Sequence, residues 1–247
     1  RRRVAPTLVG VAVIALVLAA AGALMVSAGP PVAAATAPAL GTVFIADSAN
    51  NRVVEVPPGG GTQTTVDTGL NQPVGVAVDA AGDVFIANFG NSRVVEVPAG
   101  GGAQTTVASG LSFPRGVAVD AAGDVCIADS NNSRVVEVPA GGGAQTTVGT
   151  GLNGPDGVAV DAQSDVFIAD TNNYRVVEVP AGGGAQTTVG TGLNLPTGVA
   201  VDAAGDVFIA DFTSNRVVEV PAGGGAQTTV GTGLNGPQGG GGGRRPR

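Results

Sequence analysis

The sequence predicts an all-β fold built from repeated four-stranded units, and three observations support this prediction. The 247 residues include 42 Gly and 16 Pro but only 3% aromatic residues. Valine suits half-buried strands, while Gly, Pro, Asn and Asp supply turns. One unit also recurs at a constant spacing, and each copy contains four short strand-like stretches. The arginines that open the third stretch are Arg52, Arg93, Arg134, Arg175 and Arg216, at intervals of 41 residues.

The copy beginning at Gly157 shows the expected elements. Strands are predicted over Gly157–Asp161, Asp165–Asp170, Arg175–Val179 and Ala185–Leu193. A period near 40 residues with four strands per unit is typical of the blades of a β-propeller. The second strand is apolar on both faces, so both faces must be covered, as they are when blade packs on blade.

The ends of the repeat array are less regular than its middle. The first copy has no recognisable GVAVD strand, although Ala34–Pro38 occupies its place. The last copy begins at Gly236–Gly239 and continues into a Gly/Arg tail over residues 240–247, predicted to be disordered. Four blades are complete and a fifth has three strands. About five blades are therefore visible, and a six-bladed parent stays open.

The N-terminal region differs in composition from the repeats. Residues 4–28 are uncharged and long enough, at about 1.5 Å per residue, to span a bilayer as one transmembrane helix. Arg1–Arg3 would place the preceding end in the cytoplasm. Residues 29–40 have the Pro/Ala composition of a linker. The alternative is a secretory signal peptide, and both interpretations export residues 41–239.

The repeated text, P-x-G-V-A-V-D-x-x-G-D-V-F-I-A-D-x-x-N-x-R-V-V-E-V, resembles the NHL repeat over Gly41 to Gly239. This resemblance implies a β-propeller, most often six-bladed. The order of helix, linker and repeats further resembles the extracellular sensor region of bacterial transmembrane Ser/Thr protein kinases. The sequence contains no His and hence no His-Arg-Asp catalytic loop, so a kinase domain would have to precede Arg1.

Charge narrows the possible partners. Six of the 12 basic residues lie at the two ends, so the remaining six face all 19 acids and the body carries a net charge of −13. A field of that sign repels phosphate backbones, which argues against nucleic-acid binding.

Three motifs that suggest chemistry have simpler structural interpretations. Cys126 stands where the other copies have Phe, so it is predicted to fill the core. The Asp/Asn-rich turns at 129–134 and 170–175 could offer oxygen ligands to calcium, but they lack its loop pattern and are predicted to bond their own backbone. The PAGGG loops lack the Lys and the helix of a phosphate site. We therefore predict no cofactor, no metal and no enzymatic activity in this chain.

Variation between the copies is confined to two kinds of loop. The fourth-to-first and second-to-third loops differ from copy to copy, whereas the AAGD turns and PAGGG loops hardly change. In a four-stranded meander the two variable loops emerge on one face. Aromatic residues and single charges on such loops suit a binding surface. The candidate binding residues are Val74, Phe89, Phe113, Arg115, Asp156, Tyr174, Leu195, Thr197 and Phe212.

The sequence therefore predicts a membrane-anchored extracellular propeller that binds an external ligand, protein or cell-wall component, with a possible homodimer transmitting the signal. Drift in unconstrained loops is the alternative explanation of the variation, but drift should also have altered the PAGGG loops, which hardly change. The alternatives are a secreted adhesion or scaffold propeller, a propeller hydrolase or lyase, and a truncated product with no independent fold.

Overall fold

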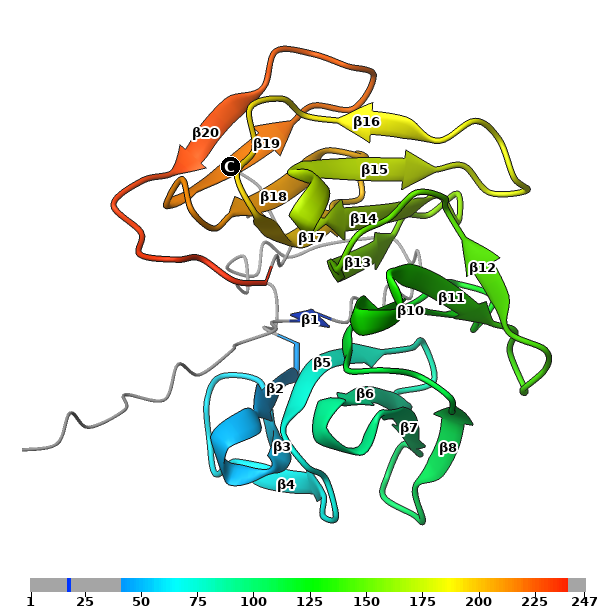
Figure 1. Cartoon of the computed structure of the whole chain (residues 1–247). Coiled ribbons are helices and arrows are strands. Elements are labelled where there is room, and N and C mark those ends of the chain that lie inside the picture. The colour runs from blue at the N-terminus through cyan, green and yellow to red at the C-terminus, as the bar shows by residue number, and fades with distance from the viewer. Residues whose placement is uncertain (1–16, 19–40, 240–247) are drawn as a thin grey trace, which may run out of the picture.

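The computed structural model describes residues 17–18 and 41–239, which form five four-stranded antiparallel sheets (Figure 1). Each sheet follows chain order from its inner to its outer strand, so each is a meander. The strands are β1 (Val17–Leu18), β2 (Val43–Asp47), β3 (Arg52–Val56), β4 (Thr64–Asp67), β5 (Pro73–Val78), β6 (Val84–Asn88), β7 (Arg93–Val97), β8 (Thr105–Ala108), β9 (Pro114–Val119), β10 (Val125–Asp129), β11 (Arg134–Val138), β12 (Thr146–Val148), β13 (Pro155–Val160), β14 (Val166–Asp170), β15 (Arg175–Val179), β16 (Thr187–Val189), β17 (Pro196–Val201), β18 (Val207–Asp211), β19 (Arg216–Val220) and β20 (Thr228–Gly231).

The five sheets are blades 1 to 5, beginning at β1, β5, β9, β13 and β17. The inner strands β5, β9, β13 and β17 contact one another in sequence around the centre. Figure 1 shows these inner strands toward the middle and β4, β8, β12, β16 and β20 at the rim. The predicted all-β propeller of four-stranded blades is therefore confirmed, with five blades in the described residues.

Short 3-10 turns connect the second and third strands of blades 1 to 4. They are η1 (Ser48–Asn50), η2 (Phe89–Asn91), η3 (Ser130–Asn132) and η4 (Thr171–Asn173). Each turn ends at a residue in the left-handed conformation, such as Tyr174 with φ 56°. The second and third strands then pair in one register, in which Asp129 lies opposite Arg134 in blade 3.

Interfaces between blades form the hydrophobic core. Four clusters of buried side chains each join two consecutive blades. Between blades 2 and 3, for example, Phe85 and Ala87 pack with Val125 and Ile127. Complete burial of such a side chain stabilises the fold by about 1.5–3 kcal/mol. A single blade buries too few of them to offset its ordering entropy, so each blade depends on its neighbours.

Close approach of the inner strands requires glycine at the third position of P-x-G. A Cβ at Gly75 would lie 2.2 Å from the backbone oxygen of Arg115 in the next blade. One at Gly116 would lie 2.6 Å from the oxygen of Asp156. The glycines therefore allow the starts of successive inner strands to touch, which brings the residues at the x positions side by side around the centre.

The N-terminal predictions fall largely outside the described residues. No helix within residues 17–18 and 41–239 is long and apolar enough to cross a membrane. Of the predicted transmembrane helix over 4–28, only Val17 and Leu18 are described, and they form β1, which pairs with β2. A short run of apolar residues suits a buried strand as well as a helix, so its periodicity does not distinguish the two. The end at 1–3, the linker at 29–40, its strand-like stretch at Ala34–Pro38 and the tail at 240–247 lie outside the described residues.

Cys126 fills the core, as predicted. Its side chain is 1% exposed and packs with Leu152 and Val158 of the linker and inner strand that follow. Burial, reinforced by the charges of Glu137, Asp120 and Asp124, raises the pKa of the thiol from 9.0 to about 12. The residue is therefore an inert apolar filler in the folded protein.

Candidate functional site

The two kinds of variable loop lie together on one face, and hydrogen bonds tie them to each other. The amide of Gly90, after β6, donates to the carbonyl of Asn71, before β5, at 2.9 Å. Asn51 Oδ1 accepts from the amide of Gln72 of the next blade at 2.8 Å. On the opposite face, Asp83 Oδ1 accepts from the amide of Ala99 at 2.7 Å, which joins the AAGD turn to the PAGGG loop. The expected division into two faces therefore holds in the structure.

A buried carboxylate anchors the variable face in most blades. In blade 3, Asp129 accepts from Arg134 Nε at 2.7 Å, from Asn132 Nδ2 at 2.9 Å and from the amide of Ser112 at 2.6 Å. Asp170 and Asp211 occupy the same position in blades 4 and 5, and all three side chains are fully buried. These aspartates hold the second-to-third loop against the loop that enters the blade. The role of these turns is structural, but their aspartates bond the side chains of Arg134 and Arg175 and the backbone of the entering loop instead of the turn's own backbone.

A hydroxyl group forms a second tie, this time between neighbouring blades. Thr171 Oγ1 of blade 4 donates to the carbonyl of Pro196, at the start of blade 5, at 2.7 Å. Ser130 of blade 3 donates to Pro155 in the same way, and Ser48 of blade 1 donates to Pro73. The first residue after the second strand therefore fastens each of these blades to the next.

The junction between blades 2 and 3 lacks both of these features. Asn88 replaces the aspartate, and its Nδ2 and the Nε of Arg93 are buried without a hydrogen-bond partner in the described residues. Phe89 replaces the serine or threonine, so it offers no hydroxyl to Pro114 of blade 3. Asn88 keeps only the bond from the amide of Asn71, at 2.8 Å. Two scaffold interactions are thus missing at one place on the variable face.

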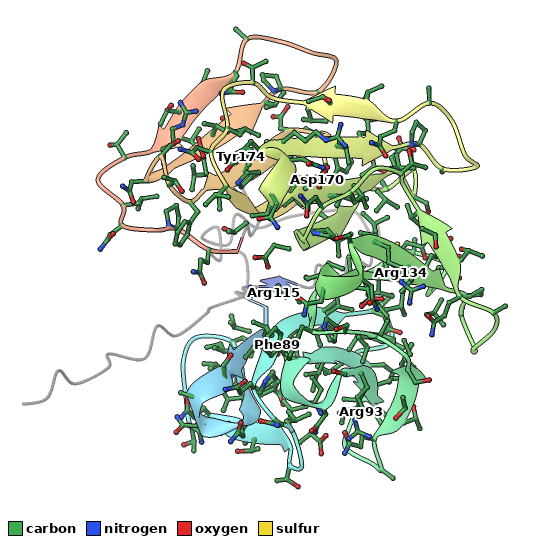
Figure 2. All side chains as sticks on the ribbon, in the orientation of Figure 1. Phe89, Arg93, Arg115, Arg134, Asp170 and Tyr174 are labelled. Carbon is green, nitrogen blue, oxygen red and sulfur yellow. The ribbon has the colours of Figure 1, made fainter. Side chains whose placement is uncertain are left out.

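An aromatic and cationic cluster occupies that place. The ring of Phe89 lies 4.7 Å from that of Phe113, centroid to centroid, and the guanidinium of Arg115 lies 5.4 Å from the Phe89 centroid. Arg115 also pairs with Asp156 of blade 4, Nη1 to Oδ2, at 3.2 Å. We call these four residues, Phe89, Phe113, Arg115 and Asp156, the arginine cluster. Figure 2 shows Arg115 and Phe89 near the centre of the ring.

The cluster is accessible to solvent. Phe113 is 41% exposed, and the side chain of Arg115 is 43% exposed. Phe113 also has φ 52°, a left-handed conformation that the equivalent residues Gln72, Gly154, Leu195 and Gly236 share. A cation above an aromatic ring contributes about 0.5–1 kcal/mol at an exposed site. An exposed phenylalanine in a conformation suited to glycine gives the fold little stability, so its presence needs another explanation.

Two opposing effects act on the pKa of the Asp156 carboxyl. Its burial raises the pKa of the carboxyl above the ordinary value of 3.8, while the charge of Arg115 lowers it. The side chain is one-quarter exposed. Because the ion pair reaches from blade 3 to blade 4, it fixes the Arg115 head group over the boundary between them.

Ring, cation–ring and ion-pair contacts join four of the nine predicted site residues, and the other five make other contacts. Thr197 donates to the carbonyl of Pro237 at 3.2 Å. Tyr174 is 56% exposed just after η4, while Val74 and Leu195 are partly buried. Phe212 lies near Gly236, where a Cβ would come within 2.9 Å of its ring. No ring contact or ion pair among residues 41–239 links these five to the arginine cluster.

Asn88 and Arg93 also belong to this region, although they are not among the predicted site residues. The sequence contained a signal that could have identified Asn88, because it is the single departure from aspartate at the end of the second strand. No group of His, Cys, Asp or Glu suited to a metal ion occurs in the described part of the chain.

The geometry defines a repeat β-propeller with one specialised junction on its variable face, and comparison with known sequences gives the repeat type. Residues 70–96, 111–137, 152–178 and 193–219 match the NHL repeat. The chain therefore carries NHL repeats, in agreement with the resemblance seen in its sequence. No curated protein sequence matches the chain.

Solved structures share the fold at low sequence identity. A streptogramin B lyase is 16% identical, with a TM-score of 0.68, over 81% of this chain and 68% of its own. A chain of the nidogen/laminin complex is 22% identical, with a TM-score of 0.68, over 73% and 72%. Virginiamycin B lyase from Staphylococcus aureus is 14% identical, with a TM-score of 0.67, over 80% and 69%. These similarities concern the fold alone.

Proposed function

We propose that this propeller is a binding module and that the arginine cluster is the centre of its binding surface. The observation that carries the proposal is the replacement of two scaffold residues at one junction. In blades 3 and 4 a buried aspartate and a hydroxyl tie the loops and blades together, whereas blade 2 has Asn88 and Phe89. The chain thus forgoes stabilising hydrogen bonds where it presents an exposed phenylalanine and an arginine.

The chemistry of the cluster suits recognition. Arginine and aromatic residues dominate the energy of many protein interfaces, because they offer large contact areas with few lost rotamers. Arg115 can donate further hydrogen bonds from the guanidinium edge that Asp156 does not use. A ligand with an acceptor group beside a flat apolar surface would fit it, such as a peptide carbonyl or carboxylate next to an apolar side chain.

The composition of this sequence favours binding over catalysis of the kind found in the similar lyases. This sequence contains no His. Among similar structures is a His-to-Ala variant of virginiamycin B lyase described as catalytically inactive, crystallised with quinupristin (13% identity, TM-score 0.62). A lyase of that kind would need a histidine that this sequence does not supply. Consumption of quinupristin by the purified chain, followed by chromatography, would instead establish the lyase alternative.

A membrane-anchored sensor is the cellular setting that the sequence favours. Residues 4–28 have the composition of a transmembrane helix, and the order of segments resembles receptor-kinase sensors. Membrane fractionation under alkaline wash tests the anchor, and replacing Val11 and Ala15 by Asp provides the matched control. Recovery of the wild-type chain in the soluble fraction would favour a secreted adhesion or scaffold propeller.

Site-specific photo-crosslinking tests the binding surface while the ligand is still unidentified. A photoreactive phenylalanine at position 113 is expected to capture a partner in the native cells. The same group at Ala181, exposed in the PAGGG loop on the opposite face, should capture none. Adding Arg115→Ala to the position-113 probe should abolish capture.

Equal capture from both positions would contradict the proposal. Persistence of capture after Arg115→Ala would remove the arginine from the site. Circular dichroism and thermal melting of each variant provide the folding control, because Arg115 is half-exposed and its loss should leave the melting temperature nearly unchanged.

A further inference from the structure

Blades 1, 3, 4 and 5 show how the loop between the second and third strands surrounds a negative charge. In each of these blades an arginine Nε donates to an aspartate Oδ2 at 2.7–2.8 Å. In blades 1, 3 and 4 an asparagine Nδ2 donates to the same oxygen at 2.8–2.9 Å. The loop therefore directs side-chain donors at one carboxylate, and hydrogen bonds to a charged acceptor are the strong ones.

The same loop of blade 2 keeps the donors but lacks the negative charge. Arg93 lies opposite Asn88 in the register of β6 and β7, where the other blades pair arginine with aspartate. No ion pair within residues 41–239 includes Arg93. Asn91, the equivalent of Asn132, donates from Nδ2 to the carbonyl of Gly69 at 3.4 Å, which is long for a hydrogen bond. The positive charge of Arg93 is thus uncompensated at this position.

A hydrogen bond to the entering loop fixes the orientation of the Asn88 amide. Asn88 Oδ1 accepts from the amide of Asn71 at 2.8 Å, as the aspartate Oδ1 does in blades 3 to 5. Exchanging Oδ1 and Nδ2 would only turn a donor toward that N–H. Nδ2 therefore lies on the side of Arg93, where the other blades have Oδ2. Asn88 is fully buried, and both its Nδ2 and Arg93 Nε lack a hydrogen-bond partner in the described residues.

We propose that Asn88 Nδ2 and Arg93 Nε form a binding site for a small monovalent anion such as chloride. Buried donors are costly without an acceptor, and a positive charge beside them favours an acceptor that is itself charged. One negative charge is also what the aspartate supplies at this position in the other blades. The anion would therefore restore the link between the third strand and the loop that the carboxylate provides there.

Burial and access restrict the anion to a small one. Both donor atoms are buried, so the larger phosphate group or a carboxylate on a protein partner is a poor fit to the site. The Arg93 side chain is partly exposed, and its Nη1 makes a long hydrogen bond to Thr106 Oγ1 at 3.5 Å. No carboxylate holds this guanidinium, so it can move outward and admit an ion.

The anion site is separate from the arginine cluster. Figure 2 shows Arg93 on blade 2, farther from the centre of the ring than Phe89 and Arg115. The two sites share no side chain, so the anion site does not rest on the proposed function.

Urea unfolding of the full chain at increasing chloride concentration tests the proposal. Sodium gluconate is replaced stepwise by sodium chloride at constant ionic strength, because gluconate is too large for the site and general salt effects stay fixed. An ion that binds only the folded state raises the folding equilibrium constant by the factor 1 + [Cl⁻]/Kd. The expected rise is about elevenfold at a chloride concentration ten times Kd.

Three variants show whether the response belongs to this site. Asn88→Asp places a carboxylate beside Arg93, so its stability should not respond to chloride. Asn131→Asp is the matched control, because it adds the same charge at an exposed position of blade 3 and should keep the wild-type response. Asp129→Asn creates the blade 2 arrangement in blade 3, so a second site should steepen the response.

Bromide gives a direct check, because it scatters X-rays anomalously. In a crystal grown with sodium bromide, an anomalous peak is expected within hydrogen-bond distance of Asn88 Nδ2 and Arg93 Nε. Two results would overturn the proposal. A wild-type chain that does not respond to chloride would leave water as the acceptor. An equal response in wild type and Asn88→Asp, or bromide found only elsewhere, would assign the ion to another site.

Discussion

The junction between blades 2 and 3 and the junction between blades 3 and 4 have the same backbone but different chemistry. Between blades 3 and 4, Asp129 and Ser130 hold the loops with a buried carboxylate and a hydroxyl. Between blades 2 and 3, Asn88 and Phe89 stand in their places. The difference shows which interactions the fold tolerates losing, and it locates the arginine cluster where two buried donors lack partners in the described residues.

Asp129→Asn should have the largest effect, because it imposes the blade 2 arrangement on blade 3. The substitution removes the carboxylate that accepts from Arg134 and leaves a buried amide donor without a partner. Losing a partner from a buried polar group costs about 1–3 kcal/mol, so the free energy of unfolding should fall by that amount. Denaturant titration measures it, and an unchanged midpoint would show that the carboxylate is dispensable.

Asn88→Asp is the reciprocal change and should stabilise the protein. The new carboxylate would accept from Arg93 Nε, which has no partner in the described structure. A hydrogen bond to a charged group contributes about 1.5–3 kcal/mol gross, and burial of the charge offsets part of it, so we expect a net gain of about 1 kcal/mol. A loss of stability in the same titration would contradict this expectation. It would show that the cost of burying the carboxylate is offset in the other blades by contacts that blade 2 lacks.

Phe113→Gly should separate stability from binding at the specialised junction. Glycine adopts the left-handed conformation without strain and already stands at positions 154 and 236. The substitution also removes the stacking on Phe89. We therefore expect the free energy of unfolding to change by less than about 1 kcal/mol. A photoreactive phenylalanine placed at position 89, which should capture the partner in the wild-type background, should no longer capture it in this variant. Retained crosslinking with unchanged stability would leave Phe113 without a role.

Asp156→Asn should have the smallest effect, and the effect should depend on pH. Burial raises the pKa of this carboxyl, so the folded state prefers the protonated form and the carboxylate costs stability at neutral pH. That cost is absent below the ordinary value of 3.8 and develops as pH rises through the raised pKa. The variant should therefore be slightly more stable at neutral pH, and the difference should vanish once the pH falls below that ordinary value. A less stable variant at neutral pH would show that the ion pair with Arg115 outweighs burial.

The sequence was sufficient for the fold because every blade repeats the same pattern. Period, turn residues and two-sided apolar strands all indicate stacked four-stranded sheets, and Cys126 fills the place that Phe occupies in other copies. The sequence also identified Phe89, Phe113, Arg115 and Asp156 as variable. It did not show that these four meet, since Phe89 and Asp156 are separated by more than one repeat.

Asn88 was not predicted as a site residue, because an Asp-to-Asn change between copies looks conservative. The substitution matters because the Asn88 side chain leaves the Nε of Arg93 without a hydrogen-bond partner in the described residues. This depends on how the two side chains pack in the folded protein. The N-terminal apolar run is a second case in which a local pattern did not determine the structure. Hydropathy alone favours a membrane helix over 4–28, whereas Val17 and Leu18 pair as a strand in blade 1.

By itself the sequence determined the repeat, the blade and the face on which the copies differ, because these follow from local patterns that recur every 41 residues. Only the tertiary structure decided which variable residues form one cluster and which buried donors beside it lack partners in the described residues. Both depend on how blades are placed around the ring, so contacts between residues far apart in the chain set them, and no local pattern encodes such contacts.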